Sequence, residues 1–222
     1  MELIARGRDA DVFVLDESRV LRRRRRGSPA EWEARVMAHV AAYGYPVPKV
    51  YEINGPDMVL ERLTGPTMLD VLARRPWRVG SLSRTLGGLH DRLHTVPAPE
   101  WLPRRFATAG DDRVLHLDLH PGNVMLTRRG PVVIDWSNAG AGDPAADVAM
   151  TLVTVGSAEV PGLAARLGRG LLVRGVRKGS RSDPAGRLRE AAEAKLADPN
   201  LTSAEAAWLR RRTGDRSGRP GR

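Results

Sequence analysis

The spacing of apolar and polar residues predicts strands in the first part of the chain. Residues 11–15 and 20–24 are short runs rich in β-forming side chains, with an Asp-Glu-Ser turn between them. Residues 49–53 and 58–63 repeat this pattern around an Asn-Gly-Pro turn. We therefore expect two strand pairs, separated by a longer segment.

One helix is expected between the two strand pairs. Ser28 and Pro29 offer a capping residue followed by proline at the first helical position, and Glu31 lies in the first turn. Four apolar residues follow at helical spacing: Trp32, Val36, Met37 and Val40. Gly44 predicts the end of this helix.

After Thr64-Gly65-Pro66 the pattern becomes mainly helical. Two short apolar strands are expected at residues 123–127 and 132–134. Helices are expected over residues 67–75, 81–93, 143–155, 158–172, 184–197 and 203–212. The sequence thus predicts an α+β fold with a small strand-rich lobe (residues 1–65), a larger helical lobe (residues 66–212) and a disordered basic tail (residues 213–222).

Composition narrows the class of protein. The chain has 222 residues, of which 41% are hydrophobic, so it is long enough to form a buried core. It has no apolar run of about 18 residues, and its first residues lack the apolar stretch of a signal peptide. We therefore expect a cytoplasmic protein with no membrane partner. The absence of cysteine excludes disulfides, thiolate metal sites and a cysteine nucleophile.

The basic charge raises the question of a nucleic-acid partner. The net charge is +10, and residues 156–222 carry 15 Lys and Arg against 7 Asp and Glu. A second basic cluster occupies residues 22–26. Aromatic residues make up only 5% of the chain and do not interleave with the basic clusters, as a base-stacking surface requires. A solvated arginine-rich surface is therefore favoured over a nucleic-acid site.

Candidate chemistry is concentrated in the middle of the chain. Asp118 and Asn123 precede the first of the two short apolar strands, and Asp135 follows the second. If these strands pair as a hairpin, Asn123 and Asp135 lie together at its open end, where a carboxylate and an amide oxygen suit a hard cation such as Mg²⁺. Asp118 would lie near that metal without binding it, which suits a base for a substrate hydroxyl.

The order of three motifs points to a family. H-x-D-x-x-x-x-N at residues 116–123, I-D-W at 134–136 and G-D-P-x-x-D at 142–147 resemble the signature of the aminoglycoside phosphotransferase and choline kinase group, relatives of the protein kinases. The resemblance extends over about residues 6–155. It implies a two-lobed, protein-kinase-like fold with an antiparallel N-terminal sheet. It also implies transfer of the γ-phosphoryl group of ATP or GTP to a hydroxyl of a small metabolite or antibiotic.

The same resemblance implies roles for individual residues in the C-terminal lobe. Asp118 would accept or orient the proton of the acceptor hydroxyl, and Asn123 and Asp135 would hold Mg²⁺. Asp147, at the start of a helix, would support the catalytic loop. His116 is expected to have a structural role in that loop.

In the N-terminal lobe the resemblance assigns Arg22 to the nucleotide phosphates and Glu33 to the helix acid that pairs with it. Arginine replaces the family's usual lysine here, and a guanidinium still binds phosphate, although the strand register relative to Arg23 is left open. Main-chain groups of Glu61 and Leu63 would contact the adenine edge. The loop expected to cover the phosphates, residues 6–11, has a single glycine, which puts nucleotide affinity in doubt.

His90 and His94 lie one helical turn apart, which is a suitable spacing for a pair of metal ligands. No third ligand is evident in the sequence. A packing or capping role is therefore favoured for both histidines.

The charge distribution bears on the acceptor. A polycationic aminoglycoside requires an acidic cleft, whereas the C-terminal stretch of this chain is basic. A neutral or anionic acceptor is therefore expected, such as a sugar, a hydroxylated metabolite or a macrolide-like molecule. The chain is short for the family, so its acceptor pocket is expected to be reduced or completed by a partner chain. The oligomeric state is left open.

Three alternatives to an active small-molecule kinase are considered. A pseudokinase or nucleotide-binding regulator is favoured by the glycine-poor loop but opposed by the joint presence of Asp118, Asn123 and Asp135. A protein kinase is opposed by Trp136, which stands where protein kinases have phenylalanine, and by the lack of an A-P-E-like segment. A nucleic-acid-binding protein would depend on the arginine clusters alone.

Overall fold

The structure is a computed structural model of the chain and describes residues 1–7, 10–25, 30–108, 110, 112–199 and 201–214. The chain forms two compact units. The first comprises Met1–Asp70 and Pro121–Ala139, and the second comprises Val71–His120 and Gly140–Arg222. Residues 121–139 therefore belong with the N-terminal part of the chain, although they lie between two segments of the second unit.

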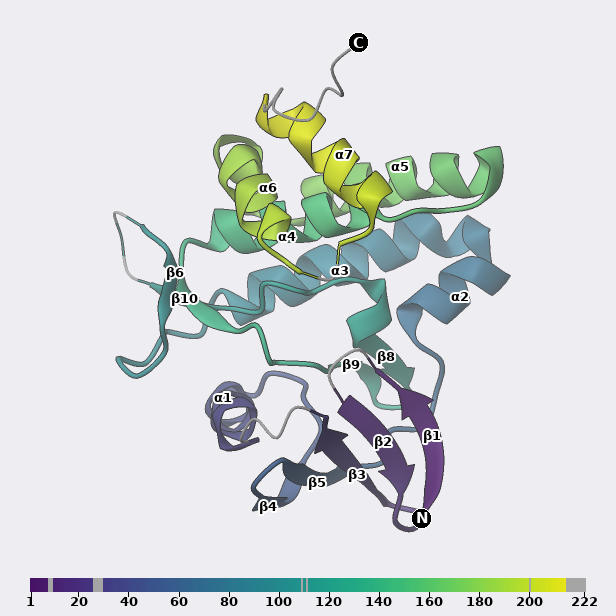
Figure 1. The fold of residues 1–222 in the computed structure, drawn as a ribbon, viewed down its shortest axis with the longest axis vertical. Coiled ribbons are helices and arrows are strands. Elements are labelled where there is room, and N and C mark those ends of the chain that lie inside the picture. The colour runs from purple at the N-terminus through teal and green to yellow at the C-terminus, as the bar shows by residue number, and fades with distance from the viewer. Residues whose placement is uncertain (8–9, 26–29, 109, 111, 200, 215–222) are drawn as a thin grey trace. The chain divides into compact units, whose positions relative to one another are not determined.

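A five-stranded antiparallel sheet forms most of the first unit (Figure 1). In sheet order β1-β2-β3-β5-β4, its strands are β1 (Glu2–Arg6), β2 (Ala10–Val14), β3 (Arg19–Arg24), β5 (Asp57–Glu61) and β4 (Val50–Asn54). The central strand β3 places Arg22 opposite Val12 on β2 and Met58 on β5. The predicted α+β class with an antiparallel N-terminal sheet is confirmed.

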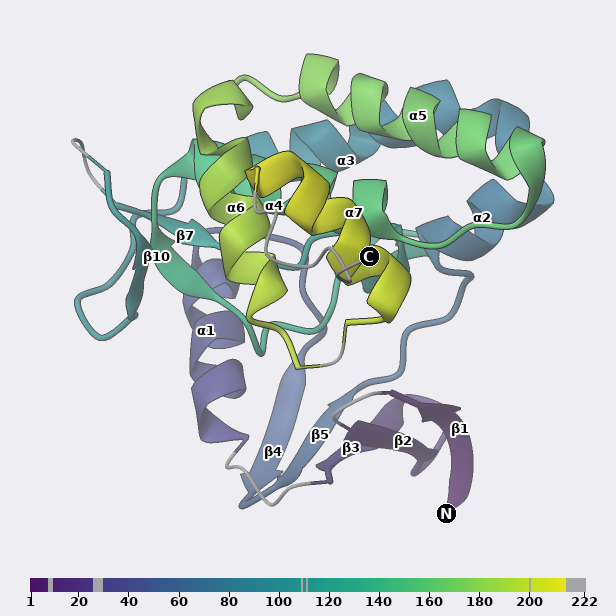
Figure 2. The same ribbon diagram turned by 45° about the horizontal axis from the view of Figure 1, so that its top comes forward.

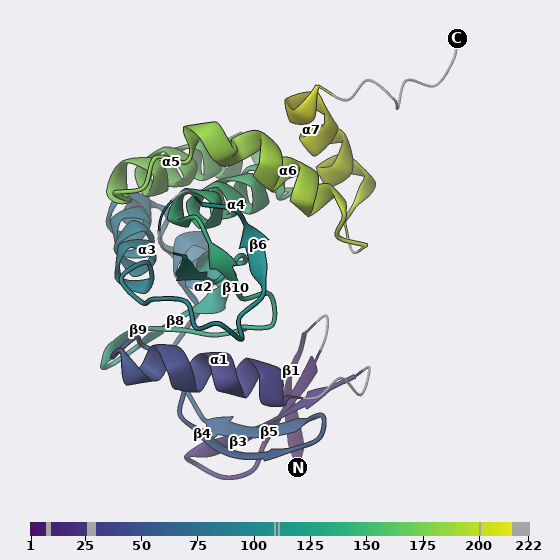
Figure 3. The ribbon, with the colours of Figure 1, turned by 90° about the vertical axis from the view of Figure 1, so that its left-hand side faces the viewer.

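The helix α1 (Glu31–Ala42) packs against β4 of this sheet (Figure 3). Its apolar stripe is buried because Val36, Met37 and Val40 are at most 2% exposed. Gly44 follows the helix with a φ of 75°, as expected for a glycine that ends a helix. The predicted start at Ser28-Pro29 lies outside the described residues, and the observed helix begins at Glu31.

A second hairpin completes the first unit. β8 (Val124–Thr127) and β9 (Gly130–Val133) pair antiparallel with Val124 opposite Val133, which confirms the predicted hairpin. Gly65 lies against β8 with a φ of 139°, and a Cβ atom there would be 2.2 Å from the carbonyl oxygen of Leu126. Only glycine fits this position, because any side chain would combine backbone strain with a direct clash.

The second unit is mainly helical. α2 (Met68–Arg74) begins in the first unit and ends in the second. The other helices are α3 (Val79–Leu93), α4 (Pro144–Ser157), α5 (Gly162–Gly179), α6 (Leu188–Leu196) and α7 (Ser203–Thr213). Asp143 caps α4 by accepting a hydrogen bond from the Ala145 N–H at 2.9 Å, as the Asp-Pro motif predicts. Buried side chains from α4, α6 and α7, among them Met150, Ala191 and Leu209, share one core.

α5 runs alongside α3 (Figure 2). The two helices approach closely at Gly87 and Gly179, where a Cβ on Gly87 would lie 2.6 Å from the backbone carbon of Gly179. Glycine at this crossing brings the backbones together. As a result, α5 packs closely along α3, and it also contacts α4.

Several elements differ from the prediction. β1 is not predicted because all its side chains are exposed, so it shows no alternating burial. Three three-residue strands, too short to give a pattern, also form a sheet of order β6-β10-β7: β6 (Arg104–Phe106), β7 (Arg113–Leu115) and β10 (Gly140–Gly142). Pro161 has an extended backbone conformation, so α5 begins only at Gly162. It continues to Gly179, whereas the predicted helix covers residues 158–172. Most of the predicted tail, residues 215–222, lies outside the described residues.

Candidate active site

Arg22 joins two carboxylates in the first unit. Its Nη1 donates a hydrogen bond to Glu33 Oε2 on α1, and its Nη2 donates to Asp135 Oδ1 at 3.1 Å. The planar, forked guanidinium makes this double contact possible, whereas a lysine ammonium is a point charge. Arg23 pairs instead with Asp57 at 2.6 Å, because successive side chains of a strand point to opposite faces. Arg22, and not Arg23, is therefore the arginine that faces Glu33, while its role toward the nucleotide phosphates stays a prediction.

Glu33 is the buried member of this group. It is 1% exposed, and its second oxygen, Oε1, accepts a hydrogen bond from the backbone N–H of Trp136 at 3.1 Å. Trp136 is fully buried and packs edge-to-face against Tyr45, with 5.5 Å between the ring centroids. A buried carboxylate is stable only with such partners, so Glu33 both orients Arg22 and fixes the chain directly after Asp135.

Asp135 follows β9 in a left-handed backbone conformation with a φ of 64°. Such a conformation costs about 1–2 kcal/mol for a residue with a Cβ atom, and hydrogen bonds hold the chain on both sides of it. The Ile134 N–H donates to the Asn123 carbonyl at 3.0 Å, and the Trp136 N–H donates to Glu33. Asn123 and Asp135 therefore flank the open end of the β8–β9 hairpin, while their role as metal ligands stays a prediction.

The predicted adenine-contact residues end β5. The Glu61 side chain accepts hydrogen bonds from Arg129 Nη2 at 2.6 Å and from the Lys49 N–H at 3.2 Å. The Glu61 N–H donates to the Lys49 carbonyl at 2.8 Å. A nucleotide contact at Glu61 would therefore need its carbonyl oxygen, and Leu63 lies just beyond the end of the strand. The main-chain role of both residues stays a prediction.

The segment that carries Asp118 follows β7 in the second unit. Leu117, directly before it, has a φ of 62°. In the described part of the chain, Leu117 and Asp135 are the two non-glycine residues with a left-handed backbone conformation. The Asp118 N–H donates to Nδ1 of the buried His116 at 3.2 Å. The Asp118 side chain is 21% exposed, with His120 Nε2 3.7 Å away. The backbone here is fixed while the carboxylate remains accessible.

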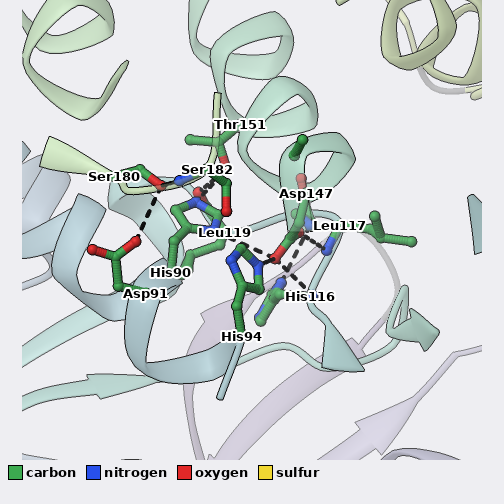
Figure 4. Close-up of polar contacts among 12 residues, drawn as sticks. His90, Asp91, His94, His116, Leu117, Leu119, Asp147, Thr151, Ser180 and Ser182 are labelled. Atoms are coloured by element: carbon green, nitrogen blue, oxygen red, sulfur yellow. Dashed lines mark hydrogen bonds and ion pairs between the residues drawn. The ribbon is translucent and has the colours of Figure 1, made fainter. Parts of the chain in front are cut away.

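Asp147 holds this segment from α4 (Figure 4). It is fully buried, and its Oδ1 and Oδ2 accept hydrogen bonds from the Leu117 N–H at 2.7 Å and the His116 N–H at 3.2 Å. Thr151, one turn further along α4, donates its hydroxyl to the Leu119 carbonyl at 2.7 Å. α4 therefore binds the backbone on both sides of Asp118.

His90 and His94 of α3 also converge on Asp147 (Figure 4). His94 Nε2 and His90 Nδ1 lie 3.0 Å and 3.3 Å from Asp147 Oδ2. Burial lowers the pKa of His94, although Asp147 opposes that shift. Burial alone would raise the pKa of Asp147, but the two histidines hold it well below its usual value. No third partner of this histidine pair is evident in the sequence, but the fold brings Asp147 to it.

The arginine run that starts in β3 and continues to Arg25 is largely paired within the first unit. Besides Arg22 and Arg23, Arg25 pairs with Asp11 at 2.5 Å, and Arg24 lies 3.9 Å from Glu33. The hydrogen bond from Arg25 lowers the pKa of Asp11. These ion pairs neutralise much of the positive charge that the sequence displays in this run. The loop predicted to cover the phosphates lies partly outside the described residues, at positions 8 and 9.

The chain belongs to the phosphotransferase enzyme family (APH), which matches it over residues 1–109 and 95–185. The family resemblance seen in the motifs is therefore confirmed. No curated protein sequence matches the chain. In the described part of the chain, no helix is both long and apolar enough to cross a membrane.

Solved aminoglycoside phosphotransferases share the fold. A thermostable mutant of APH(4)-Ia in its apo form aligns with a TM-score of 0.68 at 18% identity, over 97% of this chain and 94% of that one. The gentamicin complex of APH(2")-IIa aligns with a TM-score of 0.65 at 14% identity, over 97% of this chain and 87% of that one. ADP-bound APH(2'')-Ib aligns with a TM-score of 0.60 at 12% identity, over 94% of this chain and 90% of that one. The predicted kinase-like fold is confirmed.

Proposed function

We propose that the protein is a cytoplasmic, Mg²⁺-dependent kinase that transfers the γ-phosphoryl group of ATP or GTP to an alcohol of a small molecule. The observation that carries the proposal is the double contact of Arg22 with Glu33 and with Asp135. It joins the candidate phosphate-binding cation to the candidate metal-binding carboxylate. Membership of a phosphotransferase family supports the reaction class.

The nucleotide and metal are assigned to the first unit. Arg22 would bind the phosphates, with Glu33 holding the guanidinium in place. Asn123 and Asp135 would hold Mg²⁺, which prefers oxygen ligands and, when bound, neutralises phosphate charge. The Asp135 side chain fits this use because it is 38% exposed and its contacts with Arg22 and Ser137 involve only Oδ1. Relatives bound to ATP and to ADP support a nucleotide ligand. Its adenine would be bound by the main chain of Glu61 and Leu63.

Asp118 is proposed to orient the acceptor hydroxyl and to accept its proton. A positioned base of this kind contributes about 10²–10⁴-fold to the rate. Such a gain depends on a fixed backbone, and Asp147 and Thr151 hold the residues on both sides of Asp118. His116 adds a hydrogen bond to the Asp118 N–H itself.

The acceptor is proposed to be neutral or anionic. The exposed helix α5 carries five basic side chains and no acidic one: Arg166, Arg169, Arg174, Arg177 and Lys178. Structures of relatives contain gentamicin, streptomycin and hygromycin B. Polycationic antibiotics of this type would be repelled by the basic C-terminal stretch of this chain. Efficient phosphorylation of gentamicin by this protein would contradict the proposed acceptor class.

Phosphoryl transfer from radiolabelled ATP and GTP to a panel of sugars, hydroxylated metabolites, macrolides and gentamicin tests the function. We expect Mg²⁺-dependent turnover of a neutral or anionic acceptor. Asp118→Ala should lower kcat by about 10²–10⁴-fold with little change in nucleotide affinity. The matched control Asp183→Ala, at an exposed loop position, should keep full activity. Full activity of Asp118→Ala would contradict the assigned base. Nucleotide binding without turnover would favour the pseudokinase alternative.

A further inference from the structure

The helix α5 has an outer face that the described part of the chain leaves uncovered. Its inner face includes the buried Leu172 and Val176, and the helix contacts α3 and α4. The start of the helix has less support, because residues 161–167 are all exposed. Figure 2 shows α5 along the edge of the second unit. The outer face is therefore open to a partner.

Three leucines form an apolar row on this outer face. Leu163, Leu167 and Leu171 are 72%, 62% and 56% exposed. Residues four apart lie one above another on a helix, so the three side chains line up over two turns. Single exposed apolar residues are common on protein surfaces, whereas an aligned group of them is typical of a binding surface.

Basic side chains extend and border the leucine row. Arg174 and Lys178 continue the row toward the end of α5, and both are exposed. Arg166 and Arg177 are also exposed and lie beside the row, because each is three residues from one of its members. In the part of the chain that the structure describes, none of these four cations forms an ion pair. The helix itself has no acidic residue to neutralise them.

A partner for this face must combine negative charge with an apolar layer. A second copy of the same face would be repelled by its positive charge. Nucleic acid is disfavoured because α5 has no aromatic side chain on which bases could stack, and a phosphate backbone offers leucine no apolar contact. A bilayer with anionic headgroups offers both layers, and lipid adapts to a convex helix, whereas a protein partner would need a groove of matching shape.

We propose that the outer face of α5 binds the surface of an anionic phospholipid membrane. The leucine row would enter the boundary between headgroups and acyl chains, while the four basic side chains would stay at the phosphate groups. A helix that lies in the plane of the interface needs no long apolar run, on whose absence the expectation of no membrane partner rested. Such binding is independent of the proposed kinase activity, because α5 contains none of the residues assigned to nucleotide, metal or acceptor.

Co-sedimentation with lipid vesicles tests this binding. The full chain is mixed with vesicles of pure phosphatidylcholine, or of phosphatidylcholine with phosphatidylglycerol. We expect binding that requires phosphatidylglycerol and weakens at high salt, because exposed cations contact the anionic headgroups. Failure of the wild type to bind phosphatidylglycerol vesicles at low salt would overturn the proposal and leave the face to an acidic protein.

Leucine variants distinguish insertion from general attraction of a basic protein. Leu167→Ser should weaken the vesicle affinity by about tenfold, because it removes an apolar side chain that leaves water on binding. The matched control Leu15→Ser, at an exposed position of the first unit, should bind as wild type does. Both side chains are exposed, so both variants should stay folded, which circular dichroism checks. Equal affinity of Leu167→Ser and wild type would show charge attraction alone and would contradict the proposal.

The basic side chains have a matched control of their own. Arg174→Gln and Lys178→Gln should each weaken vesicle binding by about fivefold. Arg189→Gln on α6 removes the same charge from an arginine that already pairs with Glu193 at 2.8 Å, so it should have a smaller effect. Equal weakening by all three variants would mean that net charge, and not α5, determines binding, against the proposal.

The absence of cysteine from the chain allows insertion to be measured directly. Leu167→Cys and Leu15→Cys can each carry one environment-sensitive fluorophore. On phosphatidylglycerol vesicles we expect a blue shift of the emission at position 167 and none at position 15, because only the first enters the apolar layer. No shift at position 167, or equal shifts at both positions, would refute the assignment of α5 as the membrane-binding face.

Discussion

Asp135 and Asp147 are two aspartates of neighbouring motifs that fold into opposite environments. The Asp135 side chain is 38% exposed and accepts a hydrogen bond from Arg22, whereas Asp147 is fully buried and accepts backbone hydrogen bonds. An exposed carboxylate can give up an ion pair with an arginine and bind a metal ion instead, at little cost in free energy. A buried one cannot lose its partners without leaving unpaired charge. Exposure thus suits Asp135 to binding a ligand, whereas burial suits Asp147 to holding the backbone around Asp118.

The largest expected effect is on stability. Asp147→Ala leaves the Leu117 and His116 amides and both histidines without their shared partner, so it should lower the free energy of unfolding by about 3–5 kcal/mol. Asp135→Ala should change it by less than about 1 kcal/mol, because its ion pair is partly solvated. Urea unfolding of both variants checks this. Equal losses would erase the distinction between the two aspartates.

An intermediate effect is expected on nucleotide affinity. Arg22→Lys keeps the charge but loses the fork that joins Glu33 to Asp135, so it should weaken binding of the Mg²⁺–nucleotide complex by about tenfold, equivalent to about 1.4 kcal/mol. The matched control is Arg23→Lys on the other face of β3, where Arg23 pairs with Asp57. This control should bind nucleotide as wild type does. Equal weakening by both variants would mean that general charge, and not the double contact, determines affinity.

The smallest effect concerns a third aspartate, Asp16, in the β2–β3 turn. Its hydrogen bonds from the Ser18 N–H and from Arg19 lower its pKa from 3.8 to about 2. A lowered pKa in the folded state adds stability above the unfolded value, and this stability is lost as pH falls through the folded value. The small stability difference between wild type and Asp16→Asn should therefore shrink between pH 3.8 and about 2. A difference that stays constant over this range would contradict the assigned hydrogen bonds.

Local patterns were sufficient to predict much of the first unit and its candidate site. A short run of β-forming residues placed Arg22 on a strand, and helical spacing placed Glu33 on the next helix. The position of Asp135 after an apolar strand predicted its place at the open end of a hairpin. The choice between Arg22 and Arg23 was not predictable, because it depends on the strand register fixed by pairing with β2 and β5.

Contacts between segments that are distant in the chain could not be predicted from the sequence. β6, β7 and β10 have three residues each, and β10 pairs with two strands that lie far from it in the chain. The convergence of His90 and His94 on Asp147 likewise depends on the packing of α3 against α4, because more than fifty residues separate them. Helical spacing could identify the histidine pair, but only the tertiary fold supplies its third member.

The most direct test of the account is calorimetric binding of ATP and GTP, with and without Mg²⁺, to wild type and to Asp135→Asn. The account predicts that wild type binds nucleotide more tightly with Mg²⁺ and that Asp135→Asn loses this Mg²⁺-dependent gain while remaining folded. The absence of nucleotide binding to wild type, or an equal Mg²⁺-dependent gain in Asp135→Asn, would contradict the assignment of Asp135 as the metal-binding aspartate of a kinase site.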